Sequence, residues 1–225
     1  MRLRSLFPLA VALAWLAPRP ALAAEDPRVR PLVQAFLKAY EAVRTYQGRI
    51  RSETRVGKRV DVTRTRLWLE KPHGTAFEML ESTAIPAGVG TKLVWYGGET
   101  CDVKTRFFGL PVKLTPAADD PRLAGIRGWS IREISIASVR RVMADPQTSF
   151  RYVGPDTFLG RPMTVLEARG PQLLRGTDRE LIWLDDKLRL PFALEAYDGP
   201  ERAFRVEIET FQFDAPLPAG AFKLD

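Results

Sequence analysis

Residues 46–81 read YQGRIRSETRVGKRVDVTRTRLWLEKPHGTAFEMLE, and this stretch decides the fold class. In its first part, Tyr46, Ile50 and Val56 share one parity, while polar residues, four of them charged, occupy the other. Alternation with a period of two is typical of a strand that buries one face. The stretch therefore begins with a half-buried strand.

Short turns divide the segments that follow. Gly57-Lys58 leads into residues 59–70, and the Lys71-Pro72-His73-Gly74 turn leads into residues 75–81. The Gly97-Gly98 turn predicts a hairpin between residues 92–96 and 99–107. Later segments with strand character are residues 149–153, 161–168, 179–185, 191–197 and 201–213. In the last of these the apolar parity changes near Thr210, which predicts a β-bulge that bends the strand.

Two segments have helical spacing instead. Residues 27–44 place apolar side chains at intervals of three and four: Leu32, Val33, Phe36, Leu37, Tyr40 and Val43. Asp26 and Pro27 suit the start of this helix. Residues 131–143 predict a second helix, with Ile134, Val139 and Val142 on its inner face. Residues 108–128 lack a repeating pattern and predict a long irregular segment, which in compact domains often serves as a lid or binding loop.

These elements predict a protein that is mainly β with some α. We expect an open, strongly curved antiparallel β-barrel of about ten strands, with helices packed on its concave face. A barrel of this size tends to enclose interior volume that two short helices do not fill, so we expect a cavity.

The N-terminal residues predict a secretory signal. Arg2 and Arg4 precede the apolar run of residues 6–17, and Ala21-Leu22-Ala23 forms a small-x-small cleavage site. The run is shorter than the roughly 20 residues that a membrane span needs. We therefore expect residues 1–23 to be removed and residues 24–225 to form a single domain in the periplasm that does not itself span a membrane.

This expectation has a direct test. N-terminal sequencing of the protein released by osmotic shock, without detergent, should begin at Ala24. Recovery of membrane-bound protein that still carries Met1 would contradict the prediction.

Composition excludes several classes of site. The single cysteine, Cys101, cannot form an internal disulfide and is expected to be a buried thiol, while His73 is the only histidine. The acidic pairs Asp119-Asp120 and Asp185-Asp186 lie in turn-like contexts. We therefore expect no enzyme activity, no metal and no cofactor. Loss of the signal lowers the formal net charge from +7 to +4, which favours anionic membranes or acidic proteins as partners over nucleic acid.

Three tracts carry a resemblance to the periplasmic lipoprotein carriers of the LolA and LolB superfamily. Residues 67–72, followed by Phe77-Glu78-Met79, resemble the strand–turn–strand of that family. Residues 95–100 (WYGGET) resemble its hairpin, and residues 217–224 resemble its C-terminal Pro-x-x-x-Phe ending. With the N-terminal helix, the pattern spans nearly all of residues 24–225.

The resemblance implies an open barrel whose concave face and helices enclose an apolar cavity for acyl chains. Two features differ from the carrier itself. Lys71 stands where the carrier has arginine before the turn proline, and residues 93–143 look closer to an uncharacterised periplasmic branch of the superfamily. The resemblance therefore implies the fold more firmly than the cargo.

We interpret the protein as a carrier or binder of lipid, lipoprotein or another amphiphile. Its expected partners are lipid or an acylated protein and an inner- or outer-membrane transport complex, and the protein is expected to be a monomer. The expected cavity lining is Phe36, Tyr40, Phe77, Met79, Trp95, Phe192, Leu194, Phe204 and Val206. Phe108 and Leu110 are expected at the mouth, with Lys71 near a head group or lid.

Two alternatives remain open. The same sheet could serve as a periplasmic protein-interaction or envelope-sensing module, in which case its interior should be fully packed. The arginines of residues 49–66 could contact lipid phosphates or an acidic partner, or they could simply keep the outer face of the sheet soluble.

Overall fold

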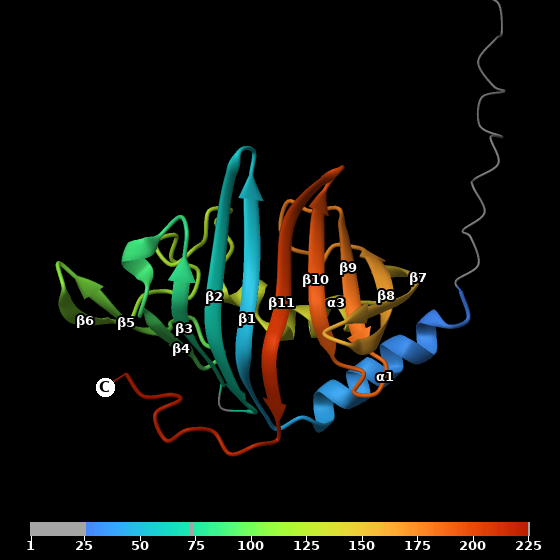
Figure 1. Ribbon diagram of the computed structural model, residues 1–225, viewed down its shortest axis with the longest axis horizontal. Coiled ribbons are helices and arrows are strands. Elements are labelled where there is room, and N and C mark those ends of the chain that lie inside the picture. The colour runs from blue at the N-terminus through green and yellow to red at the C-terminus, as the bar shows by residue number, and fades with distance from the viewer. Residues whose placement is uncertain (1–25, 73, 225) are drawn as a thin grey trace, which may run out of the picture.

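The computed structural model describes residues 26–72 and 74–224 (Figure 1). The predicted signal segment and His73 lie outside the described residues. The helices are α1 (Val29–Ala42), α2 (Ile131–Ile134) and α3 (Ile136–Ala144), with one 3-10 turn, η1 (Pro86–Gly88). The strands are β1 (Thr45–Val56), β2 (Arg59–Glu70), β3 (Gly74–Ser82), β4 (Lys92–Trp95), β5 (Asp102–Phe107), β6 (Leu110–Leu114), β7 (Ser149–Phe158), β8 (Arg161–Arg169), β9 (Arg179–Asp185), β10 (Pro191–Asp198) and β11 (Glu201–Phe213).

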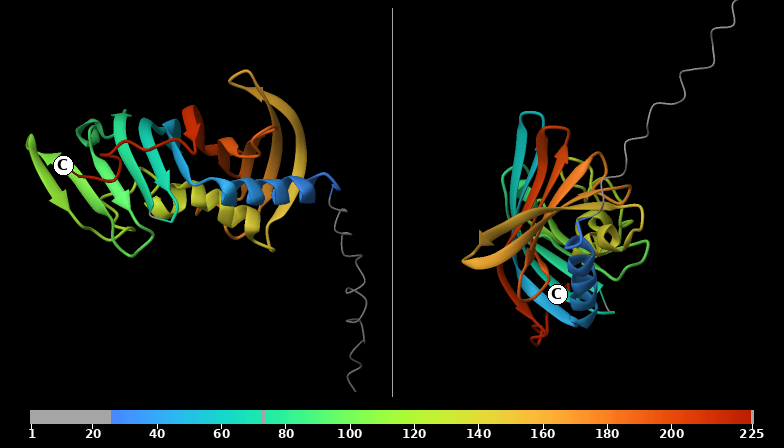
Figure 2. Two further views of the ribbon diagram at one scale, coloured as in Figure 1. Left: turned by 90° about the horizontal axis from the view of Figure 1, so that it is seen from below. Right: turned by 90° about the vertical axis from the view of Figure 1, so that its right-hand side faces the viewer.

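All eleven strands belong to one sheet, and every neighbouring pair is antiparallel. The order is β6-β5-β4-β3-β2-β1-β11-β10-β9-β8-β7, so β6 and β7 form the two edges and the barrel is open. The sheet curls around the helices, which lie on one side of it (Figure 2). The predicted fold class is confirmed.

The β-bulge is also confirmed. Arg49 pairs with Thr210 and Ile50 with Ile208, which leaves Glu209 as the extra residue of β11. An extra residue reverses the facing of every side chain after it. As a result, Phe211 and Phe213 pack in the same buried cluster as Ile208.

The irregular segment predicted at residues 108–128 is partly wrong, because it contains strand β6. Phe107 pairs with Leu110, so Phe108 and Gly109 alone form the turn between β5 and β6. Both have positive φ, at 49° and 80°, as a type I′ hairpin turn requires. The strand was missed because its residues are mostly exposed on both faces, so burial imposes no alternation on it.

The β4–β5 hairpin differs from its predicted form as well. The strands end at Trp95 and begin again at Asp102, so the connection is longer than Gly97-Gly98. The indole N–H of Trp95 donates to the Gly98 carbonyl, and Thr100 forms a bridge with Ala117. A side chain and a distant segment therefore shape this turn, and neither can be inferred from a glycine pair.

The second helix is divided in two. Ser135 has an extended backbone (φ −83°, ψ 159°) and separates the single turn of α2 from α3. A capping box fixes the start of α2, in which the Ser130 N–H donates to the Glu133 carboxylate at 2.8 Å. The Ser135 carbonyl accepts the Ser138 N–H at 2.9 Å and the Ser138 hydroxyl at 2.6 Å, so a new turn begins at this residue. Val139 and Val142 are buried as predicted, whereas Ile134 is exposed.

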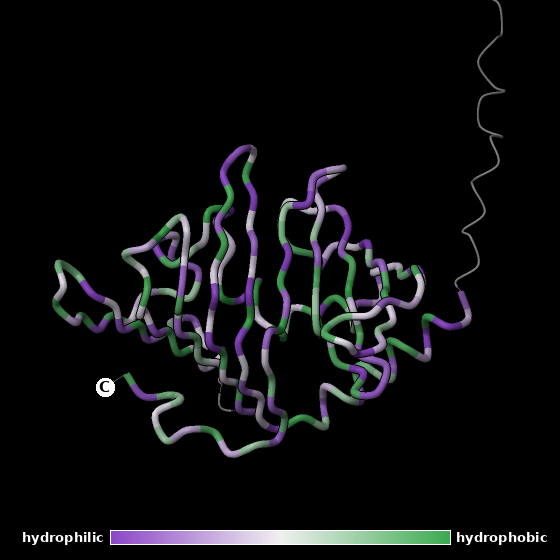
Figure 3. The backbone as a smooth tube through the Cα atoms, viewed as in Figure 1, coloured by the Kyte–Doolittle hydropathy of each residue, from purple (hydrophilic) through white to green (hydrophobic). Residues whose placement is uncertain are grey.

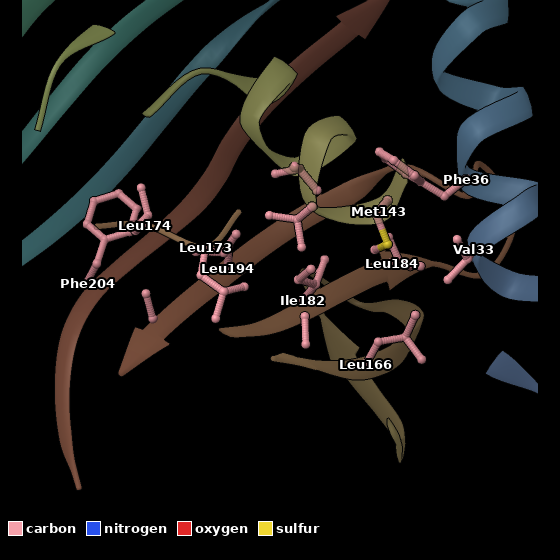
Figure 4. Close-up of a cluster of buried hydrophobic side chains, with 14 of the residues drawn as sticks. Val33, Phe36, Met143, Leu166, Leu173, Leu174, Ile182, Leu184, Leu194 and Phe204 are labelled. Atoms are coloured by element: carbon pink, nitrogen blue, oxygen red, sulfur yellow. The ribbon is translucent and has the colours of Figure 1, made fainter. Parts of the chain in front are cut away.

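Helix α1 packs on the concave face, as predicted. Its buried residues are Val29, Val33, Phe36 and Tyr40. They join a core cluster that includes Met143 of α3 and Leu166, Ile182 and Leu184 of strands β8 and β9 (Figure 4). The Asp26 carboxylate accepts the N–H of Arg28, and the Asp26 carbonyl accepts that of Val29. The N-cap is nevertheless Arg28, so the helix begins two residues later than the start predicted at Asp26 and Pro27.

The convex face carries ion pairs. Arg51 pairs with Glu207, Arg55 with Glu53, Arg64 with Glu81 and Glu209, and Arg66 with Glu78. The arginines of this face are thus largely matched by neighbouring carboxylates, the arrangement of a solvated outer surface. The tip of the β1–β2 hairpin is likewise hydrophilic (Figure 3).

The C-terminal segment covers another part of the convex side. Leu217, Phe222 and Leu224 pack against a cluster of Trp68, Ala76, Val94 and Ala221. Cys101 is buried, as predicted, and burial raises the pKa of its thiol. Across residues 26–72 and 74–224, no helix has the length and apolar character needed to cross a membrane.

Candidate functional site

A cavity of about 100 Å³ lies between the concave face of the sheet and the α2–α3 segment. A larger groove of about 260 Å³ lies elsewhere, among Gln47, Arg66 and Thr210. Because the lining of the first is mostly apolar, we call it the main cavity. Strands β1, β2, β3, β9, β10 and β11, helices α2 and α3, and residues 172–174 contribute to its lining. The apolar lining comprises Ile50, Leu67, Phe77, Ile134, Ile136, Val139, Val142, Leu173, Leu174, Pro191, Phe192, Ala193, Leu194, Phe204, Val206 and Ile208. Ile134, Arg141 and Gln172 are exposed, so they mark where the cavity reaches the surface.

The register of the strands explains why these residues meet. Phe77 lies opposite Leu67, Ile50 opposite Ile208, and Leu194 opposite Val206. Residues directly opposite in an antiparallel pair share a face, so their side chains form a continuous apolar floor. Curvature of the sheet then turns this floor towards α2 and α3.

Seven polar side chains line the main cavity, and three of them are buried. The Tyr46 and Ser135 hydroxyls are buried and have no hydrogen-bond partner among the described residues. Burial raises the pKa of the Tyr46 phenol. The third is Glu180, which is 2% exposed. Buried polar groups are normally paired, so these three give the main cavity unused hydrogen-bonding capacity.

Glu180 occupies an inward position of β9, with Ile182 and Leu184 at the same parity. Its Oε1 accepts the N–H of Leu174 at 2.8 Å, which ties the loop after β8 to β9. Burial raises the pKa of this carboxyl to about 7, against the single opposing effect of the Leu174 N–H. The group therefore titrates near neutral pH.

This pKa predicts a dependence of stability on pH. A carboxyl whose folded pKa is raised stabilises the fold fully below its unfolded pKa, and that contribution is lost as pH rises through about 7. Between pH 5 and pH 8 we expect wild type to lose on the order of 2 kcal/mol of unfolding free energy relative to Glu180→Gln. Urea denaturation of both proteins at each pH measures the difference, and parallel pH profiles would refute it.

Five residues of the predicted lining reach the main cavity. They are Phe77, Phe192, Leu194, Phe204 and Val206. Phe204 also packs edge-on against Trp129, with ring centroids 5.4 Å apart, so it supports the core as well as the cavity.

Two further predicted residues line a separate small cavity of about 10 Å³. Tyr40 and Lys71 meet there, and Tyr46 and Ile136 line both cavities. The Lys71 ammonium donates to the Tyr40 carbonyl and lies 4.0 Å from the centre of the Tyr40 ring. Lys71 thus satisfies a carbonyl at the C-terminal end of α1, and desolvation lowers its pKa.

The other predicted residues lie outside both cavities. Phe36 is fully buried in the core between α1 and the sheet, and Met79 lies beside η1. Trp95 contacts the β4–β5 connection. Phe108 and Leu110 lie on the β5–β6 hairpin, where Phe108 is 92% exposed, and neither lines the main cavity. The tip of this hairpin is hydrophobic (Figure 3).

Sequence reasoning missed Glu180, Ser135 and the loop residues Gln172, Leu173 and Leu174. Figure 4 shows Leu173 and Leu174 close to Phe204 and Leu194. A signal for Glu180 was present, because a charged residue shared the parity of two apolar ones. The loop gave no such signal, since its residues have no periodicity.

Comparison with known proteins bears on the fold. No protein-family model matches this chain, and no curated protein sequence matches it. A solved structure of an uncharacterized conserved protein from Thermus thermophilus matches with a TM-score of 0.54 and 10% identity, covering 87% of this chain and 93% of that one. The lipoprotein LppX of Mycobacterium tuberculosis matches with a TM-score of 0.53 and 14% identity, covering 86% and 99%.

A LolA superfamily protein from Nitrosomonas europaea is among the structural neighbours, with a TM-score of 0.38 and 12% identity, covering 84% of this chain and 96% of that one. That score is too low to carry an argument about function. The likeness to the structures from Thermus thermophilus and Mycobacterium tuberculosis therefore concerns the fold alone, and function has to be argued from the residues of this chain.

Proposed function

We propose that this protein binds the apolar part of an amphiphile, a lipid or the acyl chain of a lipoprotein, in the main cavity and carries it in the periplasm. The observation that supports this most is a concave apolar surface, formed by five strands, that opens beside Ile134, Arg141 and Gln172. Each CH₂ group transferred from water into such a surface contributes roughly 0.8 kcal/mol. In this proposal the acyl chain contacts the five predicted residues that line the main cavity, which are Phe77, Phe192, Leu194, Phe204 and Val206.

The size of the cavity limits what it holds without rearrangement. At about 100 Å³, it is smaller than the cavity of about 150 Å³ that admits benzene. A whole acyl chain therefore requires the α2–α3 segment to move away from the sheet. The protein has a hinge for this movement at Ser135, because the extended backbone of this residue separates the single turn of α2 from α3.

Native mass spectrometry of the purified protein tests the proposal. We expect a fraction of molecules to carry lipid, and delipidated protein to take up a fluorescent fatty-acid analogue. Hydrogen exchange of residues 131–144 should change when the analogue binds, because the acyl chain displaces this segment from its position against the sheet. Protein without lipid that also fails to take up the analogue would refute the proposal.

A second candidate function rests on a different observation. The same small cavity volume fits a largely packed interior, and the β5–β6 hairpin exposes Phe107, Phe108 and Leu110 at an edge of the sheet. Exposed apolar clusters of this kind commonly mark protein-binding surfaces. A periplasmic interaction or sensing module is therefore the function that a negative lipid-binding result would favour.

A further inference from the structure

Five carboxyl groups are buried in the described part of the chain, and Glu180 differs from the others in its partners. Asp185 pairs with Arg161 and accepts two backbone N–H groups. Asp61 accepts hydrogen bonds from Ser82, Thr83 and Ala84. Glu167 and Glu195 each form ion pairs with at least two arginines, which are Arg151, Arg169 and Arg179 for the first and Arg202 and Arg205 for the second.

Glu180 has one hydrogen bond, from the Leu174 N–H, and no ion pair within residues 26–72 and 74–224. A carboxylate has room for about four hydrogen bonds, and burying it with one is costly. Stability alone does not explain such a residue, because an apolar side chain at this inward position would match Leu173, Leu174 and Leu194, which line the same cavity. A buried carboxyl with spare capacity that lines a cavity is instead typical of a binding site.

The surroundings indicate which ligand would suit it. The other titratable or charged groups that line the main cavity are Tyr46 of β1, Glu133 of α2 and Arg141 of α3. Glu133 is engaged with Ser130 and Arg175, and the Arg141 guanidinium donates to the Arg132 carbonyl. Among the described residues, Glu180 therefore has no cation of the protein as a partner, and a ligand cation or donor can take that place.

We propose that Glu180 is the polar anchor of the main cavity and that the preferred ligand is an amphiphile whose head group donates hydrogen bonds, above all an alkylammonium. This rests on the proposed function, since it assumes that an apolar chain enters the cavity. The ammonium group forms charge-assisted hydrogen bonds with Glu180, while the chain lies along β10, β11 and β3 towards Phe77. The Tyr46 and Ser135 hydroxyls, which have no partner among the described residues, offer further hydrogen bonds to polar groups of the ligand in the same cavity.

The test compares dodecylamine, dodecanol and dodecanoic acid by calorimetric titration at pH 8, with the amine and the acid below their micellar concentrations and the alcohol below its solubility limit. Hydrogen bonds between charged partners are about twice as strong as neutral ones. We therefore expect wild type to bind the amine at least about tenfold more tightly than the acid. Glu180→Gln keeps an oxygen for the Leu174 N–H but lacks the charge, so it should lose this preference. Glu201→Gln, an exposed residue of β11 with the same charge change, should retain it.

Lowering the pH provides a readout that a purely structural role would not move. At pH 5 the Glu180 carboxyl is protonated. The ratio of amine affinity to acid affinity should therefore be the same for wild type as for Glu180→Gln. Equal binding of amine and acid at pH 8, or a preference that survives in Glu180→Gln, would overturn this inference while leaving the proposed function intact. If wild type binds none of the three compounds, the proposed function is refuted, and this inference with it.

Discussion

Phe77→Asp should weaken uptake of a fluorescent fatty-acid analogue by at least about tenfold, because an uncompensated charge on an apolar binding surface costs more than about 1.4 kcal/mol. Phe77 lies on β3 opposite Leu67 and Leu93, and its half-buried ring forms one end of the apolar floor. Since the ring is not fully enclosed in the core, the substituted protein should still fold. Fluorescence titration measures the loss, and circular dichroism checks the fold.

The matched control is Phe108→Asp. Phe108 carries the same side chain but is 92% exposed on the β5–β6 turn, away from the main cavity. Its positive φ of 49° suits aspartate better than phenylalanine. Uptake by this variant should equal that of wild type. If Phe77→Asp proves unfolded, Phe77→Ala tests the same contact, with a smaller expected loss of uptake. Normal uptake by a folded Phe77 variant would contradict the assignment of the main cavity as the binding site.

Gly48→Ala should destabilise the fold by about 4 kcal/mol, at or above the upper end of the usual range for overpacking. A Cβ at this position would overlap the Thr210 carbonyl oxygen and lie 2.9 Å from the Tyr46 hydroxyl. The first contact is with backbone, at the bulge of β11, so β1 and β11 would have to separate. Glycine is required at position 48 because the backbone of β11 at Thr210 lies too close to β1 to leave room for a Cβ.

Thermal unfolding measures this effect against Gly98→Ala. Nothing lies within 4 Å of a Cβ added at Gly98, so this control should stay within about 0.5 kcal/mol of wild type. For a chain of this size, the Gly48 variant should melt roughly 8 to 16 °C lower. A melting temperature close to that of wild type would show that the β1–β11 junction is more open than the structure has it.

Local periodicity determined most of the secondary structure. Alternation in residues 46–81 and the parity change near Thr210 are read directly from the chain, because one buried face imposes a period of two on each strand. The helical stripe of residues 27–44 is equally local. β6 was missed, and the helix break at Ser135 was missed, because neither an exposed strand nor a capping serine leaves a periodic trace.

The candidate site depended on tertiary structure. Phe36 and Phe204 both follow an apolar pattern, yet only Phe204 reaches the main cavity, because α1 presses Phe36 against β8 and β9 while sheet curvature leaves space below α2 and α3. Sequence also could not show that Lys71 would contact the end of α1, or that Glu180 would be buried beside Leu174. The sequence by itself determined which residues face inward; the strand register and the placement of the helices decided which of those meet a cavity and which meet one another, since both arise from contacts between residues far apart in the chain.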